Sequence, residues 1–122
     1  MDCKEFGYLT KMQILAILQL VYQLIASAAY GRFSEADDSS IDIAMKYMGF
    51  VGSSFMENLG NQFWNEAMDN MNPFQAFDIV SSFPAEKKQV FKNMFLEIVR
   101  EDNSFLRLDI AKQTFRRVGI SY

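Results

Sequence analysis

Histidine is absent from the chain, and cysteine occurs only once, at Cys3. The lack of histidine excludes Ser-His-Asp and Cys-His catalysis and any histidine-ligated metal. A single cysteine excludes a disulfide within the chain and a CxxC zinc or redox site. A metal would therefore need oxygen ligands, which favours Ca²⁺, Mg²⁺ or Mn²⁺.

Basic residues are sparse, since 12 Lys and Arg stand against 15 Asp and Glu among 122 residues, a net charge of −3. The adjacent basic pairs are Lys87-Lys88 and Arg116-Arg117, which we interpret as solvated helix faces. Neutralising phosphates needs clustered Lys and Arg, so we expect no nucleic-acid partner.

Linkers and low-complexity segments are also lacking, and hydrophobic residues make up 50% of the chain, with 12 Phe and 8 Met. A chain of this length buries roughly two thirds of the surface that it exposes when unfolded. We expect one globular domain over residues 1–122, with residues 1–10 as a frayed N-terminus.

The apolar run at residues 12–30 has the composition of a signal sequence or a membrane span. However, Gln19, Gln23 and Ser27 recur every four residues and draw a polar stripe along one face of a helix. A signal sequence or a membrane span has little reason to carry such a stripe. We expect a largely buried first helix, no stable membrane insertion and a cytoplasmic location; a secreted precursor is the alternative.

Apolar spacing indicates helices in the remainder, and no two-residue alternation typical of strands occurs. A middle set and a later set each repeat every four residues: Met56, Leu59, Phe63, Ala67 and Met71, widened by Trp64 and Met68, and then Val90, Phe91, Met94, Phe95, Ile98 and Val99. We interpret both sets as core. A pocket between helices for a lipid or small apolar molecule is the alternative.

Capping signals divide the chain into about six helices. Asn72 before a proline predicts one helix start, and Pro84 opens another helix that should run to about Arg100. Gly49 and Gly119 follow amphipathic stretches, as helix-ending glycines do. The expected fold class is all-α, a compact helical bundle.

Two stretches, 30–42 and 102–109, share one pattern. A turn residue is followed by Phe and then Asp at the same spacing: Gly31, Phe33 and Asp37, and again Asn103, Phe105 and Asp109. Each stretch follows an apolar helix and precedes a helix that ends at a glycine. The pattern predicts two related helix-turn-helix units with pseudo-twofold character.

With these elements the chain resembles the TerB-like family, named after a tellurite-resistance protein. Its recurring element is an apolar helix, Asp-Gly, any residue, an apolar residue, often Ser, and then an acidic residue. The copies here read YGRFSEAD from Tyr30 and DNSFLRLD from Asp102, and FPAEKKQVFKNMFLEIVREDN resembles the helix before the second copy. The resemblance covers about residues 12–120 and implies an all-helical fold.

The resemblance also implies divalent metal at the acidic positions. Asp37, Asp102 and Asp109 match those positions, whereas Tyr30 stands where an aspartate is expected. A Ca²⁺ or Mg²⁺ site at these three aspartates is one expectation.

Helix capping is the competing explanation of the same residues. Ser34 and Ser39 each precede an aspartate by three positions, which is the spacing of a capping box. Asp102 could cap the last helix, and Asp109 would then lie near its start.

No nucleophile or phosphate-cradle motif such as GxSxG or GxxxxGK[ST] occurs, and we expect no enzyme.

The resemblance implies a sensing or scaffolding part. The favoured hypothesis is a non-enzymatic protein-interaction or scaffold module in a stress-response setting, whose exposed Phe and Met contact an unidentified protein or a second copy of the chain as a homodimer. The alternatives are the metal site, a helical regulator that binds a small apolar ligand, and an enzyme acting through carboxylates and metal.

Overall fold

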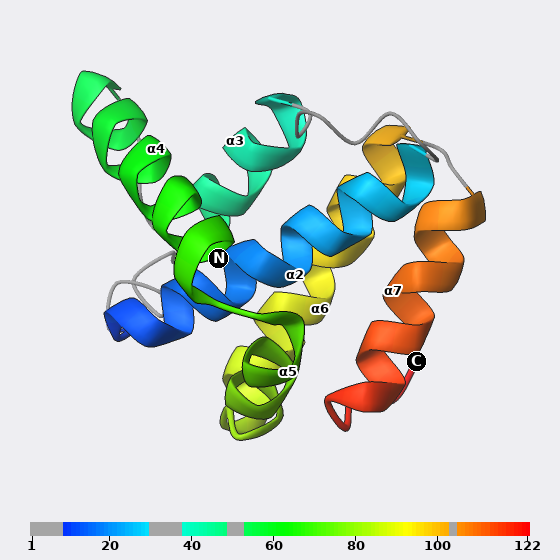
Figure 1. Cartoon of the computed structure of the whole chain (residues 1–122). Coiled ribbons are helices and arrows are strands. Elements are labelled where there is room, and N and C mark those ends of the chain that lie inside the picture. The colour runs from blue at the N-terminus through cyan, green and yellow to red at the C-terminus, as the bar shows by residue number, and fades with distance from the viewer. Residues whose placement is uncertain (1–8, 30–37, 49–52, 103–104) are drawn as a thin grey trace.

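The computed structural model of the chain describes residues 9–29, 38–48, 53–102 and 105–122 (Figure 1). Within these residues the chain forms six helices and no strand. The helices are α2 (Lys11–Ala29), α3 (Asp38–Tyr47), α4 (Ser53–Asn70), α5 (Pro73–Ser81), α6 (Ala85–Asp102) and α7 (Phe105–Arg117). The expected all-α helical bundle is confirmed.

Helix α2 lies across the middle of the molecule and contacts α3, α4, α5 and α7 (Figure 1). Its buried apolar residues are Ile14, Leu15, Ala16, Ile17, Leu18, Leu20, Val21, Leu24 and Ile25. A helix covered on several sides needs apolar residues around most of its circumference, which explains the long apolar run. The largely buried first helix is therefore confirmed. No helix in the described part of the chain combines the length and apolar character needed to cross a membrane.

The first residue of the polar stripe on α2, Gln19, is buried against α4. Gln19 is 5% exposed, and its Nε2 donates to the carbonyl oxygens of Ala67 at 3.1 Å and Met71 at 2.5 Å. Its Oε1 accepts a hydrogen bond from Nε2 of Gln23 at 3.1 Å. The Ala67 carbonyl also accepts from the backbone N–H of Met71, whereas the Met71 carbonyl lies just beyond the end of α4. Gln19 therefore supplies donors to the end of α4 and holds the corner between α4 and α5 on α2.

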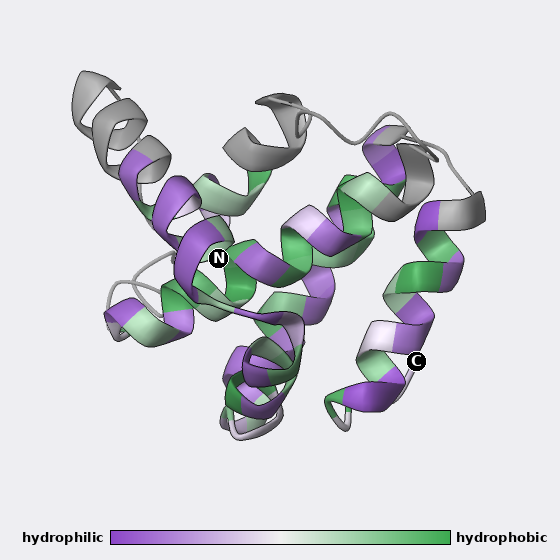
Figure 2. Ribbon diagram, viewed as in Figure 1, coloured by the Kyte–Doolittle hydropathy of each residue, from purple (hydrophilic) through white to green (hydrophobic). Residues whose placement is uncertain are grey.

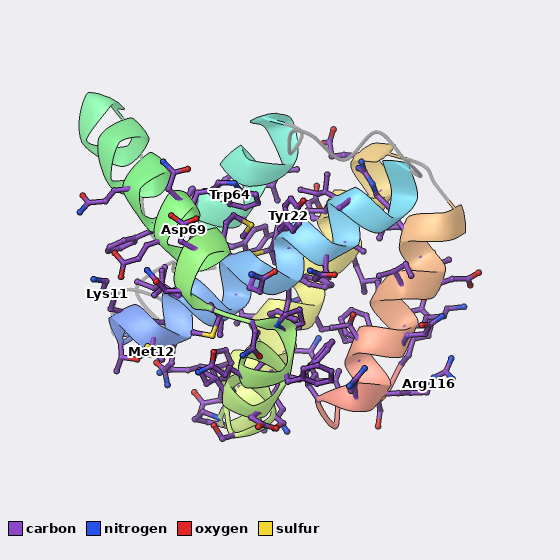
Figure 3. The ribbon with its side chains drawn as sticks, in the orientation of Figure 1. Lys11, Met12, Tyr22, Trp64, Asp69 and Arg116 are labelled. Atoms are coloured by element: carbon purple, nitrogen blue, oxygen red, sulfur yellow. The ribbon has the colours of Figure 1, made fainter. Side chains whose placement is uncertain are left out.

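Two further contacts join α4 to α2 (Figure 3). The rings of Tyr22 and Trp64 meet edge to face, with 6.1 Å between their centroids. Nζ of Lys11 lies 2.7 Å from a carboxylate oxygen of Glu66. An ion pair at this level of exposure contributes little, so the rings and Gln19 are the main determinants of where α4 lies.

Helix α6 supplies the aromatic part of the core. The residues expected to face inward are all buried: Val90, Phe91, Met94, Phe95, Ile98 and Val99. The rings of Phe91 and Phe95 have centroids 4.4 Å apart, and those of Phe95 and Phe115 5.9 Å apart. Tilted ring pairs at these separations are favourable, and the pair of Phe95 and Phe115 joins α6 to α7. In Figure 2, hydrophobic residues follow most of α2, whereas α7 alternates between hydrophobic and hydrophilic residues.

The middle set of expected core residues lies on α4. Ala67 and Met71 are buried, and Phe63, Trp64 and Met68 are partly buried against the core. Met56 and Leu59 fall among residues whose side chains are not described. The core interpretation is confirmed for the described members of this set.

The start of α5 matches its predicted capping signal. Oδ1 of Asn72 accepts from the backbone N–H of Gln75 at 2.9 Å, and Oε1 of Gln75 accepts from the backbone N–H of Asn72 at 3.3 Å. This reciprocal pair is a capping box, and Pro73 occupies the first helical position, where its missing N–H costs nothing.

The end of α7 also matches its predicted signal. Gly119 has a φ of +78°, a conformation that glycine adopts readily. The N–H groups of Gly119 and Ile120 donate to the carbonyls of Arg116 and Phe115, which together form a Schellman motif. Gly49, the other expected helix-ending glycine, lies outside the described residues.

The contacts between helices can be compared with the two expected helix-turn-helix units, which correspond to α2 with α3 and to α6 with α7. Helix α2 contacts α3 and α7, while α6 contacts α7 and α3. Exchanging α2 with α6 and α3 with α7 maps these contacts onto one another, in agreement with the expected pseudo-twofold character. Helix α5 lies outside this exchange and packs mainly on α2.

Replacing Gln19 by leucine should lower the free energy of unfolding by about 2 kcal/mol, because the Met71 carbonyl loses a donor in a buried place. Gln23→Leu is the matched control; it removes a partly exposed bond and should cost less than about 1 kcal/mol. Urea denaturation of both variants measures the difference. Equal losses would contradict the role assigned to Gln19.

Candidate functional site

The structure places the three predicted metal-binding aspartates as follows. Asp37 lies outside the described residues. Asp102 is the last residue of α6, and Asp109 is exposed on α7. Within the described part of the chain, no group of three acidic or cysteine residues is close enough to hold a metal ion.

The helix boundaries correct part of the capping interpretation. Helix α7 begins at Phe105, so Asp109 lies a full turn beyond its start, and its first turn contains no acidic residue. Asp102 is the last residue of α6 and lies three positions before the first residue of α7. Because α3 already includes Ser39, this serine lies inside the helix and does not precede it. Capping thus explains neither Asp102 nor Asp109.

A buried arginine lies in the same segment. Arg107, in the first turn of α7, is 7% exposed. A guanidinium that leaves water needs hydrogen-bonded or charged partners, so Arg107 is a structural cation of this segment. The burial of Arg107 was not predicted from the sequence, because an arginine between two leucines in LRLD is typical of an exposed charge on an amphipathic helix.

An exposed aromatic surface lies where α5 meets α7. Phe74 is 68% exposed. The guanidinium carbon of Arg117 lies 5.5 Å from the centre of the Phe74 ring and 4.3 Å from that of Phe77. Cations at these distances are attracted by the ring faces. We call Phe74, Phe77 and Arg117 the aromatic–arginine surface.

Beside this surface, α6 and α7 bring together basic residues from distant parts of the sequence. The ammonium groups of Lys92 and Lys112 lie 5.4 and 4.7 Å from the centre of the Tyr122 ring. Nζ of Lys88 lies 3.3 Å from the place that a Cβ at Gly119 would take. Arg116 follows Lys112 by one helical turn at the end of α7 (Figure 3). The basic face, as we name it, consists of Lys88, Lys92, Lys112, Arg116 and Arg117.

The basic face has no carboxylate partner within the described residues. The ion pairs found there join Lys11 to Glu66 and Arg100 to Glu97. Lys92 donates to the backbone carbonyl of Ser121 at 2.6 Å. Neighbouring cations without counter-charges create a positive potential that attracts anions.

The sequence analysis interpreted the basic pairs as separate solvated helix faces. Their exposure agrees with that interpretation for Arg116 and Arg117, whereas Lys87 and Lys88 are half-buried. The sequence did not indicate that the packing of α6 on α7 brings these basic residues close to Lys92 and Lys112. The available signal was the four-residue spacing of basic residues on two consecutive helices.

A pocket of about 370 Å³ lies at the corner between α4 and α5. Its polar lining includes Gln19, Asn72 and Gln75. These three side chains already form the bond to α4 and the capping box described above. The pocket is therefore part of the structural joint, and we assign it no ligand.

Comparison with known proteins found no match to a family model, a curated protein or a solved structure. The resemblance to the TerB-like family therefore stays a prediction.

The turn at Gly119 directs the last residues back over α6 and α7, so that Tyr122 stacks on Phe115 with 6.1 Å between ring centroids. Gly119→Ala should lower the free energy of unfolding by about 1 kcal/mol, because alanine disfavours a positive φ. Gly119→Asn should cost less, since asparagine tolerates this conformation. Thermal unfolding compares the two, and an unchanged stability of the alanine variant would contradict the Schellman assignment.

Proposed function

We propose that this chain is a non-enzymatic helical module that binds another protein through the aromatic–arginine surface. The observation that carries the proposal is the 68% exposure of Phe74 beside the guanidinium of Arg117. Aromatic residues and arginine contribute much of the binding energy in protein interfaces. Covering an exposed Phe side chain contributes about 2 kcal/mol.

The surface is also held in place by the fold. Phe77 packs partly against the core, and Arg117 lies closest to its ring. Phe74 is in the first turn of α5, which the capping box at Asn72 fixes. A surface that is ordered before binding loses less conformational entropy when a partner covers it. This favours a binding role for the pair of helices.

The absence of histidine and of nucleophile motifs supports the non-enzymatic part of the proposal. The resemblance to the TerB-like family supports a scaffold role in a cytoplasmic stress response. The non-enzymatic character and the scaffold role are both parts of the proposed function.

Affinity capture from native cells with the full chain as bait tests the binding role. Phe74→Ala should reduce recovery of the specific partner by about tenfold, since it removes the anchor side chain. Met12→Ala is the matched control, because Met12 is also large, apolar and 49% exposed but lies on α2. Equal recovery with the wild type and Phe74→Ala would contradict the proposal. Light scattering of the purified chain shows whether the partner is a second copy.

A divalent-cation site at Asp37, Asp102 and Asp109 is a second candidate. It is favoured by the position of Asp102 at the end of α6, where the helix dipole does not stabilise a carboxylate. The end of α2, the end of α6 and the start of α7 also lie toward the same side of the molecule (Figure 1).

Calorimetry and thermal melting with Ca²⁺ or Mg²⁺ test this site. Binding should stabilise the fold by about 1.4 kcal/mol at ten times the Kd, and Asp109→Asn should abolish both the heat and the stabilisation. Asp78→Asn, an exposed aspartate on α5, should leave both unchanged. No heat and an unchanged melting temperature at millimolar ion would dispose of the site.

A further inference from the structure

We infer that the basic face receives an acidic segment of a partner protein that also places an apolar side chain on Phe74. This inference rests on the proposed function and specifies the chemistry of the partner. It is carried by charge complementarity, because the face joins five cations that form no ion pair with a carboxylate among the described residues.

The charge of the basic face contrasts with that of the whole chain. The chain has a net charge of −3, yet the first half of α6 and the second half of α7 contribute Lys88, Lys92, Lys112, Arg116 and Arg117. The carboxylates closest in sequence are those of Glu86 and Asp109, both exposed. Neither forms an ion pair with the face.

Stabilisation of helix ends explains only part of the clustering of these basic residues. A helix end has the equivalent of about half a negative charge, which favours one or two cations in its last turn. Lys88 lies beside Gly119, and Lys92 bonds to the carbonyl of Ser121, so these lysines suit the end of α7. Arg116 and Arg117 already occupy the last turn of α7, so Lys112 adds charge beyond that need. Their repulsion is relieved when an anion binds.

The neighbouring surface favours a peptide as the source of that anion. Arg117 belongs to both surfaces and contacts Phe74 and Phe77, so charge and apolar area are continuous. The guanidinium groups of Arg116 and Arg117 suit planar carboxylates, which they can bind through two hydrogen bonds. A segment with acidic residues beside a large apolar residue matches both parts.

Nucleic acid is a weaker match to the same face. Double-stranded DNA carries a charge about every 1.7 Å, and tight binding neutralises many phosphates over a long track. Here the cations occupy the end of one helix pair, and the net negative charge of the chain repels the remaining phosphates. A short acidic peptide needs only the few cations of this helix pair and does not extend over the rest of the chain.

Fluorescence anisotropy with the full chain tests the inference. The probe is a labelled peptide of about a dozen residues, rich in Glu with one central Phe, and its matched control has Gln in place of Glu. The acidic peptide should bind at least about tenfold more tightly than the control peptide. Its affinity should fall about tenfold between roughly 20 and 200 mM salt, because exposed charges are screened.

Two charge reversals separate a local effect from a change of net charge. Arg116→Glu should weaken binding of the acidic peptide at least about tenfold. Lys46→Glu makes the same change of charge on an exposed lysine of α3 and should leave binding within about twofold of the wild type. Equal weakening by both variants would overturn the inference.

Labelled oligothymidine and phosphatidylserine vesicles are the competing probes. Tighter binding of either probe than of the acidic peptide would overturn the inference, and so would the absence of peptide binding at millimolar concentration. If capture that depends on Phe74 persists in that case, the proposed function stands and only the acidic partner is excluded. If that capture is also absent, both fail.

Discussion

Burial of α2 among the other helices is the constraint on which the rest of the structure depends. A helix covered on several sides has no solvated face for its polar side chains, so each one must find a partner in the protein. Gln19 meets this need at the end of α4, 48 positions later in the sequence. These bonds hold the end of α4 on α2, and the packing of α5 on α2 places Phe74.

The features predicted correctly from the sequence depend on neighbouring residues. The inward face of α6, the capping box at Asn72 and the turn at Gly119 each lie within one or two helical turns of the chain, where spacing and backbone preference act directly. The role of Gln19 and the basic face could not be predicted this way, because both require knowing which helices pack together. The helix expected to run to about Arg100 ends at Asp102, which agrees within the one or two residues by which helix ends vary.

Charge is distributed unevenly along the pair α6 and α7. The outer end carries the basic face and one carboxylate, that of Glu86, whereas acidic residues outnumber Arg100 and Arg107 at the end where the two helices connect. The pair thus has a more positive and a more negative end. Such an asymmetry orients an approaching charged partner before contact.

The bond between Gln19 and the end of α4 has a consequence for the motions of the chain. Helices α4 and α5 are connected by Met71 and Asn72, and the carbonyl of Met71 is one of the two acceptors of Gln19. Proteins open in cooperative units whose free energies are lower than that of global unfolding. Loss of the Gln19 bonds would release the corner from α2, whereas the amides of α2 itself would exchange with solvent only when the whole core opens. We therefore expect local opening of the domain to begin where Gln19 bonds to the corner between α4 and α5.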